Sequence, residues 1–159
     1  MDDSAIRKQL EQLILGQGAH VPVERALANL PREHRGTVPP GLVHSVWQLL
    51  EHIRIAQEDL IQYAVDPAWQ SPEWPHGYWP ADPEPPDDGA WERSLEDLRK
   101  GRDAAIALVH DAGRDLTAPL PHAPQHNLLR QLVLVADHAA YHGAQIVDAR
   151  RVLGAWPPA

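Results

Sequence analysis

The sequence predicts an all-α protein, a four-helix bundle whose helices run up, down, down and up with a long crossover between helices 2 and 3. Apolar residues recur at helical spacing in four long segments, a proline-rich stretch at about 66–86 separates the middle two, and no segment shows a convincing strand pattern. Short loops force antiparallel neighbours. This crossover can extend about 70 Å, whereas a helix of about 24 residues is about 36 Å long, so it allows two parallel helices.

The amino-terminal part predicts one long and one short helix. Apolar residues share a face behind Asp2, Asp3 and Ser4, which can cap the start of a helix, and Gly16 and Gly18 can end it. A short helix is expected over about 22–30, because its apolar residues also share a face and Pro31 stops a helix there. The first of the four long helices therefore precedes a shorter one.

The other long helices follow from the same pattern. The second is expected over 41–65, where the apolar stripe is unbroken, and the third begins at Asp87 or Asp88 and continues to about His110. The last runs from about 127 to 153 and stops at Gly154. Gly143 lies inside this last helix, where it weakens the helix by about 1 kcal/mol, so we expect another helix to pack closely there.

The crossover at about 66–86 has a composition of its own, with seven prolines and three tryptophans. So many prolines exclude a helix or a strand. A connection of this length usually has a function or packs on itself. Each tryptophan can bury about 150–250 Å², so we expect the part from Trp69 to Trp79 to fold against the bundle.

Composition and charge exclude several classes of protein. The chain of 159 residues suits a single domain over 1–159, and it holds no apolar run long enough to span a membrane. It has no cysteine, which excludes disulfides and a cysteine nucleophile. A net charge of -8 makes nucleic acid and anionic membranes poor partners. The amino end, MDDSAIRKQL, lacks the regions of a signal peptide, so a cytoplasmic protein is expected.

Three of the ten histidines are expected to face the interior of the bundle. His138 and His142 lie one turn apart on the last helix and can bind one ion together. Their neighbours on the same face are apolar, and so are those of His52 on the second helix. A buried imidazole without a partner costs about 1–3 kcal/mol, so three of them favour a shared cause. That cause is a metal ion or, alternatively, a His–Asp or His–His hydrogen-bonded network.

The remaining polar residues give weaker indications. His44 precedes His52 by two turns and can line the same cavity. Glu51 and Asp137 each precede an inward histidine, which turns them about 100° away from the site. No HEXXH motif, phosphate loop or nucleophile elbow is present, and no catalytic residue is identified. The other histidines are expected at the surface: His20, His34, His76, His110, His122 and His126.

In these features the chain resembles the DinB-like superfamily, which includes damage-inducible DinB and YfiT-like helical bundles. The resemblance covers Val43 to Trp156 and rests on the segments HSVWQLLEHIRIAQEDLI, SPEWPHGYWP with AWERSL, LLRQLVLVADHAAYHGAQI and LGAW. Its most specific part is one histidine on the second helix with a DHxxYH-type pair on the fourth, the metal motif of the family. It implies a four-helix bundle with a long crossover, often a homodimer, and a divalent ion bound by His52, His138 and His142.

Two classes of function follow. Zinc is the expected ion, although nickel, manganese or iron also tolerate such a site. Three imidazoles leave an open coordination position on zinc, and an open position suits a metal-dependent transferase or hydrolase. Some members of the family are thiol S-transferases that use low-molecular-weight thiols such as bacillithiol or mycothiol, and one branch is a mycothiol-dependent isomerase. The resemblance therefore implies a small-molecule substrate, although the Trp-Pro crossover departs from common enzymatic members. The alternative is a non-catalytic, stress-related protein whose ion is structural or sensed.

Overall fold

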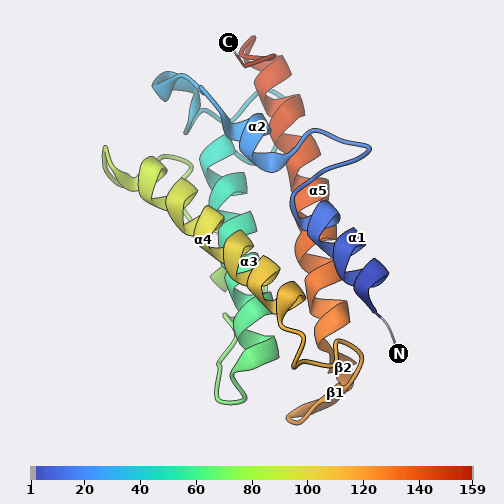
Figure 1. The fold of residues 1–159 in the computed structure, drawn as a ribbon. Helices are drawn as coiled ribbons and strands as arrows, with labels where there is room; N and C mark the ends of the chain where they lie inside the picture. The colour runs from blue at the N-terminus through green and yellow to red at the C-terminus, as the bar shows by residue number, and fades with distance from the viewer. Residues whose placement is uncertain (1–2, 159) are drawn as a thin grey trace.

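Most of the chain is helical in the computed structural model, which describes residues 3–158 (Figure 1). An all-α class therefore broadly fits. The elements of these residues are α1 (Ser4–Ile14), α2 (Val23–Leu27), η1 (Arg32–His34), α3 (Val46–Val65), η2 (His76–Tyr78), α4 (Ala90–His110), β1 (Pro119–Leu120), β2 (Ala123–Asn127) and α5 (Leu128–Val152).

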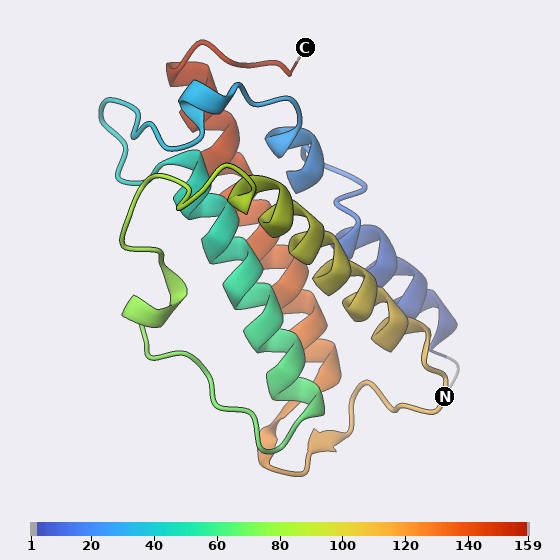
Figure 2. The ribbon, with the colours of Figure 1, turned by 90° about the vertical axis from the view of Figure 1, so that its left-hand side faces the viewer.

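The helices pack around α3 and α5. These two lie side by side, α4 packs against α3, α1 contacts both α4 and α5, and the short α2 lies on α5. In Figures 1 and 2, α3 and α4 run in one direction and α1 and α5 in the other. The long connection between α3 and α4 is what lets these neighbours run parallel, because it returns the chain to the end where α3 began.

The start of α3 differs from the prediction. We expected this helix from residue 41, but it begins at Val46 because Ser45 forms a capping box with Gln48. The Ser45 hydroxyl accepts from the Gln48 backbone N–H at 3.2 Å, and the Gln48 side-chain oxygen accepts from the Ser45 N–H at 3.1 Å. Such a cap stabilises a helix by about 0.5–2 kcal/mol. The residues before it, 41–44, are therefore a loop at the end of the α3–α5 pair.

The expectation that the chain has no strand is wrong, since β1 and β2 form an antiparallel pair just before α5. Leu120 faces Ala123 across it, and both side chains are buried. Prolines 119, 121 and 124 concealed this ribbon in the sequence. Proline is excluded from central strands but tolerated at an edge, and both strands of a two-stranded ribbon are edges.

Two groups of apolar residues form the core. One lies around α2 and includes Leu27 and Ile146, and the other lies beside α1 and includes Leu132. Along α5, His138 and His142 fall between these two groups. On α5, the two histidines therefore lie where one apolar group gives way to the other, whereas His52 on α3 is flanked by Leu50 and Ile53 of the group around α2.

The close approach expected at Gly143 is confirmed. A Cβ atom added there would lie 3.1 Å from Val23 Cγ2, which is tighter than an ordinary contact. The absence of a side chain therefore lets α2 rest on α5.

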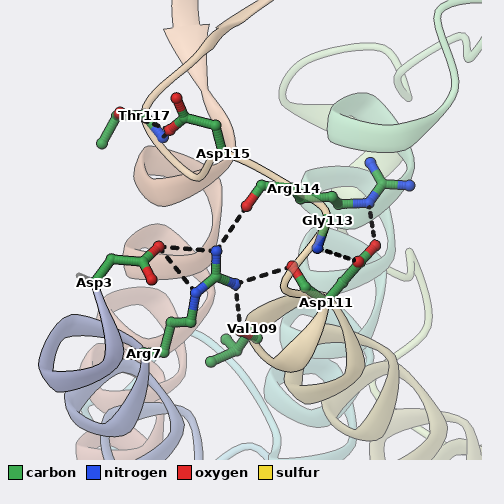
Figure 3. A network of polar contacts seen from close by, with 8 residues as sticks. All are labelled: Asp3, Arg7, Val109, Asp111, Gly113, Arg114, Asp115 and Thr117. Atoms are coloured by element: carbon green, nitrogen blue, oxygen red, sulfur yellow. Dashed lines mark hydrogen bonds and ion pairs between the residues drawn. The ribbon is translucent and has the colours of Figure 1, made fainter. Parts of the chain in front are cut away.

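Figure 3 shows how Arg7 joins α1 to the end of α4. Its guanidinium donates to the backbone oxygens of Val109 at 2.6 Å, Asp111 at 3.1 Å and Arg114 at 2.6 Å, and it pairs with Asp3 at 2.8 Å. The last carbonyls of a helix have no partner within the helix, and a cation complements the negative end of its dipole. Arg7 therefore satisfies carbonyls that α4 itself leaves open.

The crossover folds along α3, as expected (Figure 2). The Asp59 carboxylate of α3 accepts from the Trp69 indole N–H at 2.8 Å and from the Tyr78 hydroxyl at 2.7 Å. Burial, together with the bond to Asp59, raises the pKa of Tyr78 to about 12. Among the three tryptophans of the crossover Trp74 is the exception, with 74% of its surface exposed. The expectation of no helix here is wrong only for the single 3-10 turn η2.

Candidate metal centre

The structure brings His52, His138 and His142 together between α3 and α5, and we call them the histidine triad. The Nε2 atom of His52 lies 3.1 Å from that of His142 and 3.0 Å from that of His138. The potential ligand atoms of all three lie within 4.8 Å of one another. Four ligands placed tetrahedrally at about 2.0–2.1 Å from zinc are separated by about 3.3–3.4 Å. The spacing therefore suits a group that could hold one metal ion.

The orientation of two of these rings is fixed by their other nitrogen. His52 Nδ1 lies 2.9 Å from the backbone oxygen of Tyr78, and His142 Nδ1 lies 2.7 Å from the Gln145 side-chain oxygen. Both partners can only accept, so each Nδ1 carries the proton and donates it. The Nε2 atoms of His52 and His142 are then unprotonated, and their lone pairs point toward each other. Two such acceptors at 3.1 Å repel unless a cation lies between them.

Burial keeps the triad uncharged. Loss of solvent lowers the pKa of His52 to about 4, although the bond to Tyr78 acts in the opposite direction. The same cause, followed by the nearby rings of the triad, lowers the pKa of His138 to about 4. Burial also lowers the pKa of His142. Metals bind the neutral form of imidazole, so these residues are prepared to act as ligands near neutral pH.

A stack of three aromatic rings covers one side of the triad. Trp79, at the end of η2, lies with its ring centre 3.7 Å from that of His52 and tilted by 7°. His44 lies on the opposite face of Trp79, at 3.9 Å and 14°. The crossover thus contributes both a hydrogen-bond acceptor and an aromatic wall to the site. His44 lies near the triad, as predicted, but Trp79 separates it from His52.

The acidic neighbours of the triad lie outside it. Glu51 pairs with Arg54 of the same helix at 2.8 Å, and Asp137 is exposed. Both observations agree with the predicted rotation away from the site. Tyr141 is 64% exposed, and the centre of its ring lies 4.8 Å from that of His142.

The remaining histidines lie elsewhere. Four are exposed, as predicted, whereas His34 and His126 are half-buried. His126 Nδ1 lies 2.9 Å from the Tyr63 hydroxyl, and His122 Nε2 lies 2.8 Å from the Tyr63 backbone oxygen. This pair belongs to the ribbon beside the end of α3. It does not join the triad.

Sequence reasoning did not identify the atoms that orient the triad. Gln145 follows His142 by three residues and therefore faces the same way, a spacing that could have drawn attention to it. The Tyr78 backbone oxygen and the Trp79 ring come from a proline-rich loop, whose path no periodicity predicts. Their contribution required the structure.

These features define a class of mostly helical protein with three histidine nitrogens gathered where they could hold a metal ion. The model of the DinB superfamily matches residues 22–146, and the protein belongs to this superfamily. No curated protein and no solved structure matches the chain. Within residues 3–158, none of the helices combines the length and apolar character needed to cross a membrane.

Proposed function

We propose that the protein binds one divalent metal ion through the Nε2 atoms of His52, His138 and His142. The observation that supports this proposal most strongly is that the Nε2 atoms of His52 and His142 lie 3.1 Å apart, while the Nδ1–H group of each ring donates to another acceptor. A purely hydrogen-bonded network leaves no proton between these two nitrogens. A cation shared by the triad removes this repulsion. Superfamily membership supports the same conclusion.

The donor set favours zinc, since imidazole nitrogens are common ligands of this ion. Nickel, manganese and iron also accept nitrogen donors. Three protein ligands leave room for at least one more, as in catalytic zinc sites. We also propose that α1, α3, α4 and α5 form the four-helix bundle, up, down, down and up, with the ion joining α3 to α5.

The activity we propose is that of a metal-dependent transferase of the thiol S-transferase type, with a hydrolase as the variant that uses water. A bound divalent ion would lower the pKa of a thiol or of water beside it. In the transfer, the thiol sulfur bonds to an electrophilic carbon, the leaving group departs with its electron pair, and the thiol proton passes to solvent. Tyr78 and Gln145 hold two rings of the triad, and Trp79 shields one side from water.

A non-catalytic role is the second candidate. The triad joins α3 to α5, and an ion bound there would stabilise the folded state in proportion to the logarithm of its concentration over Kd. In that case, the stress-related protein would use its ion as a structural or sensed group. A homodimer stays a prediction, with exposed Val133 as one apolar residue that a partner could cover.

Isothermal titration with Zn²⁺, Ni²⁺ and Mn²⁺ tests the metal site. We expect one ion per chain and a loss of affinity of at least about 100-fold in His142→Ala and His52→Ala, because two nitrogens hold an ion weakly. His20→Ala, at an exposed histidine outside the triad, is the matched control. Equal affinity in all four proteins would refute the proposed site.

The activity is tested separately on the metal-loaded protein. Low-molecular-weight thiols and electrophiles are combined with it, and turnover is compared with that of His138→Ala. Turnover that needs a thiol supports the transferase, and turnover without one leaves the hydrolase. Tight binding of an ion whose remaining coordination position is filled by a fourth protein ligand would favour the structural role.

A further inference from the structure

One face of α3, together with its cap, carries a row of polar residues that bind the crossover: Ser45, Gln48, His52 and Asp59. These positions fall within an arc of about 60° around the helix. The Ser45 hydroxyl donates to the Pro83 backbone oxygen at 2.6 Å. The Gln48 amide nitrogen donates to the Pro80 backbone oxygen at 3.1 Å. The crossover therefore returns along α3, and His52 lies within the row that holds it (Figure 2).

Tyr78 connects two residues of this row. Its backbone oxygen accepts from His52 Nδ1 at 2.9 Å, and its hydroxyl donates to the Asp59 carboxylate at 2.7 Å. His52 and Asp59 are seven residues apart, about 10.5 Å along the helix. The other oxygen of the same carboxylate accepts from the Trp69 indole at 2.8 Å. Because Tyr78 is held at both ends, its side chain helps to determine where its backbone oxygen lies.

The position of this backbone oxygen selects the tautomer of His52. A carbonyl oxygen only accepts, so it keeps the proton on Nδ1 and leaves Nε2 free for a metal. Without this acceptor the proton can move to Nε2, and a protonated Nε2 cannot bind an ion. His142 differs, because its acceptor is the Gln145 side chain on its own helix. Of these two rings, only His52 depends on the crossover for its orientation.

We propose that Asp59 and Tyr78 are positioning residues of the metal centre. Through Tyr78, the Asp59 carboxylate holds the acceptor that keeps the His52 proton on Nδ1. The role in metal binding rests on the proposed function, whereas the effect on the tautomer does not need an ion. Coupling between two equilibria is reciprocal, so the crossover must also be held more firmly when an ion is bound.

The tautomer of His52 is measured first, in the full-length, metal-free protein at neutral pH. Long-range ¹H–¹⁵N NMR spectra show which nitrogen of an imidazole carries the proton. We expect Nδ1 in the wild-type protein and a mixture of tautomers in Tyr78→Phe and Asp59→Ala, each of which breaks the bond between the two side chains. His142 should keep its proton on Nδ1 throughout. A His52 proton that stays on Nδ1 in both variants would overturn the proposal.

Zinc affinity, measured by isothermal titration, is the second readout. We expect Tyr78→Phe and Asp59→Ala to bind Zn²⁺ at least about threefold more weakly. This loss is smaller than the roughly 10–100-fold expected for a direct partner of a ligand, because both residues act one step away.

Tyr63→Phe is the matched control. It removes a hydroxyl that bonds to His126 at 2.9 Å, near the far end of α3, and should bind zinc as the wild type does. Equal weakening in Tyr63→Phe and Tyr78→Phe would mean that any lost hydroxyl on this helix has the same effect, which contradicts positioning.

Hydrogen exchange tests the reciprocal effect. Zn²⁺ should slow exchange of the backbone amides in 76–82 of the wild-type protein at least about threefold, and unchanged exchange would contradict the coupling. Zinc binding that is equal in the wild type, Tyr78→Phe and Asp59→Ala would overturn this inference and leave the proposed function intact. A wild-type protein that takes up no zinc, yet shows the change of tautomer in the variants, would refute the proposed function while supporting the control of His52 by Tyr78.

Discussion

The second nitrogen of each imidazole decides what the first can do. In His52 and His142, the Nδ1–H group donates to a backbone oxygen and to an amide oxygen, respectively, so both rings present unprotonated Nε2 atoms to the same point. Partners of this kind raise the basicity of metal-binding histidines and fix their tautomer. The partner atoms are therefore as necessary to the site as the rings themselves.

Gln145→Leu tests this dependence. The variant keeps the size of the side chain but removes the acceptor of the His142 proton, so we expect Zn²⁺ to bind about 10–100-fold more weakly with the helical content unchanged. Isothermal titration measures the zinc affinity, and circular dichroism measures the helical content. Gln125→Leu, at an exposed glutamine of β2, should bind zinc normally. Wild-type affinity in Gln145→Leu would show that His142 needs no such partner.

Trp79 should report metal binding by its fluorescence. Its ring is stacked on His52 at 3.7 Å, whereas Trp74 is 74% exposed and packs only against Tyr78 among the aromatic rings of residues 3–158. A Ni²⁺ ion at the triad would quench Trp79 more than any distant tryptophan. We expect Trp79→Leu to lose most of the quenching by nickel and Trp74→Leu to keep it. The reverse order would place the ion elsewhere.

The three ligand candidates could be proposed from sequence, but their surroundings could not. His138 and His142 lie four residues apart on a clear amphipathic helix, and His52 shares an apolar face with its neighbours, so helical periodicity alone points all three inward. Trp79 and the Tyr78 carbonyl follow from the path of an irregular loop. That path depends on tertiary hydrogen bonds, which leave no periodic pattern in the sequence.

Among the helices and connections, the crossover is held on α3 largely by one residue, Asp59. One carboxylate of α3 holds Trp69 and Tyr78, and the Tyr78 backbone oxygen in turn holds His52. The loop is thereby joined to the helix at two points, and its ordering is coupled to the triad.

Asp59→Ala should loosen the crossover. The change leaves the Trp69 indole and the Tyr78 hydroxyl without their acceptor, and hydrogen bonds to a charged group contribute about 1.5–3 kcal/mol. We expect amide hydrogen exchange in 69–79 to be about 10–100-fold faster, with α5 unaffected. Glu58→Ala removes an exposed neighbouring carboxylate and is the control. Unchanged exchange in Asp59→Ala would mean that packing alone orders the crossover.

Arg7 has a comparable role between α1 and α4. Arg7→Met keeps the length of the side chain but removes the donors to three backbone oxygens (Figure 3). We expect a lower midpoint of thermal unfolding than in Arg130→Met, which changes an exposed arginine of α5. Scanning calorimetry of both variants decides this. Equal midpoints would show that water replaces Arg7 at the end of α4.

The long helices could be located from the sequence because their apolar stripes are long, but their ends depended on specific side chains. The last helix starts at about residue 127, as expected, because the Asn127 side-chain oxygen accepts from the Arg130 backbone N–H at 2.8 Å and caps α5. The start of α3 was misplaced because the apolar pattern continues before Ser45, whose capping box overrides it. The ribbon of β1 and β2 was not predicted, because three prolines in so short a segment argue against a strand.

Considered together, the helices enclose a polar site within an apolar core. The two apolar groups lie on either side of the triad along α5, so the site is supported from both directions while the crossover closes it laterally.

X-ray absorption spectroscopy of the zinc-loaded protein tests the metal site most directly, because it reports the ligands of the ion itself. The proposed site predicts three imidazole nitrogens at about 2.0–2.1 Å, with the multiple scattering typical of histidine, and one or more additional light atoms. His138→Ala, reconstituted in the same way, should show fewer imidazoles. A zinc ion surrounded by carboxylate and water oxygens alone, unchanged in His138→Ala, would contradict the proposed metal site.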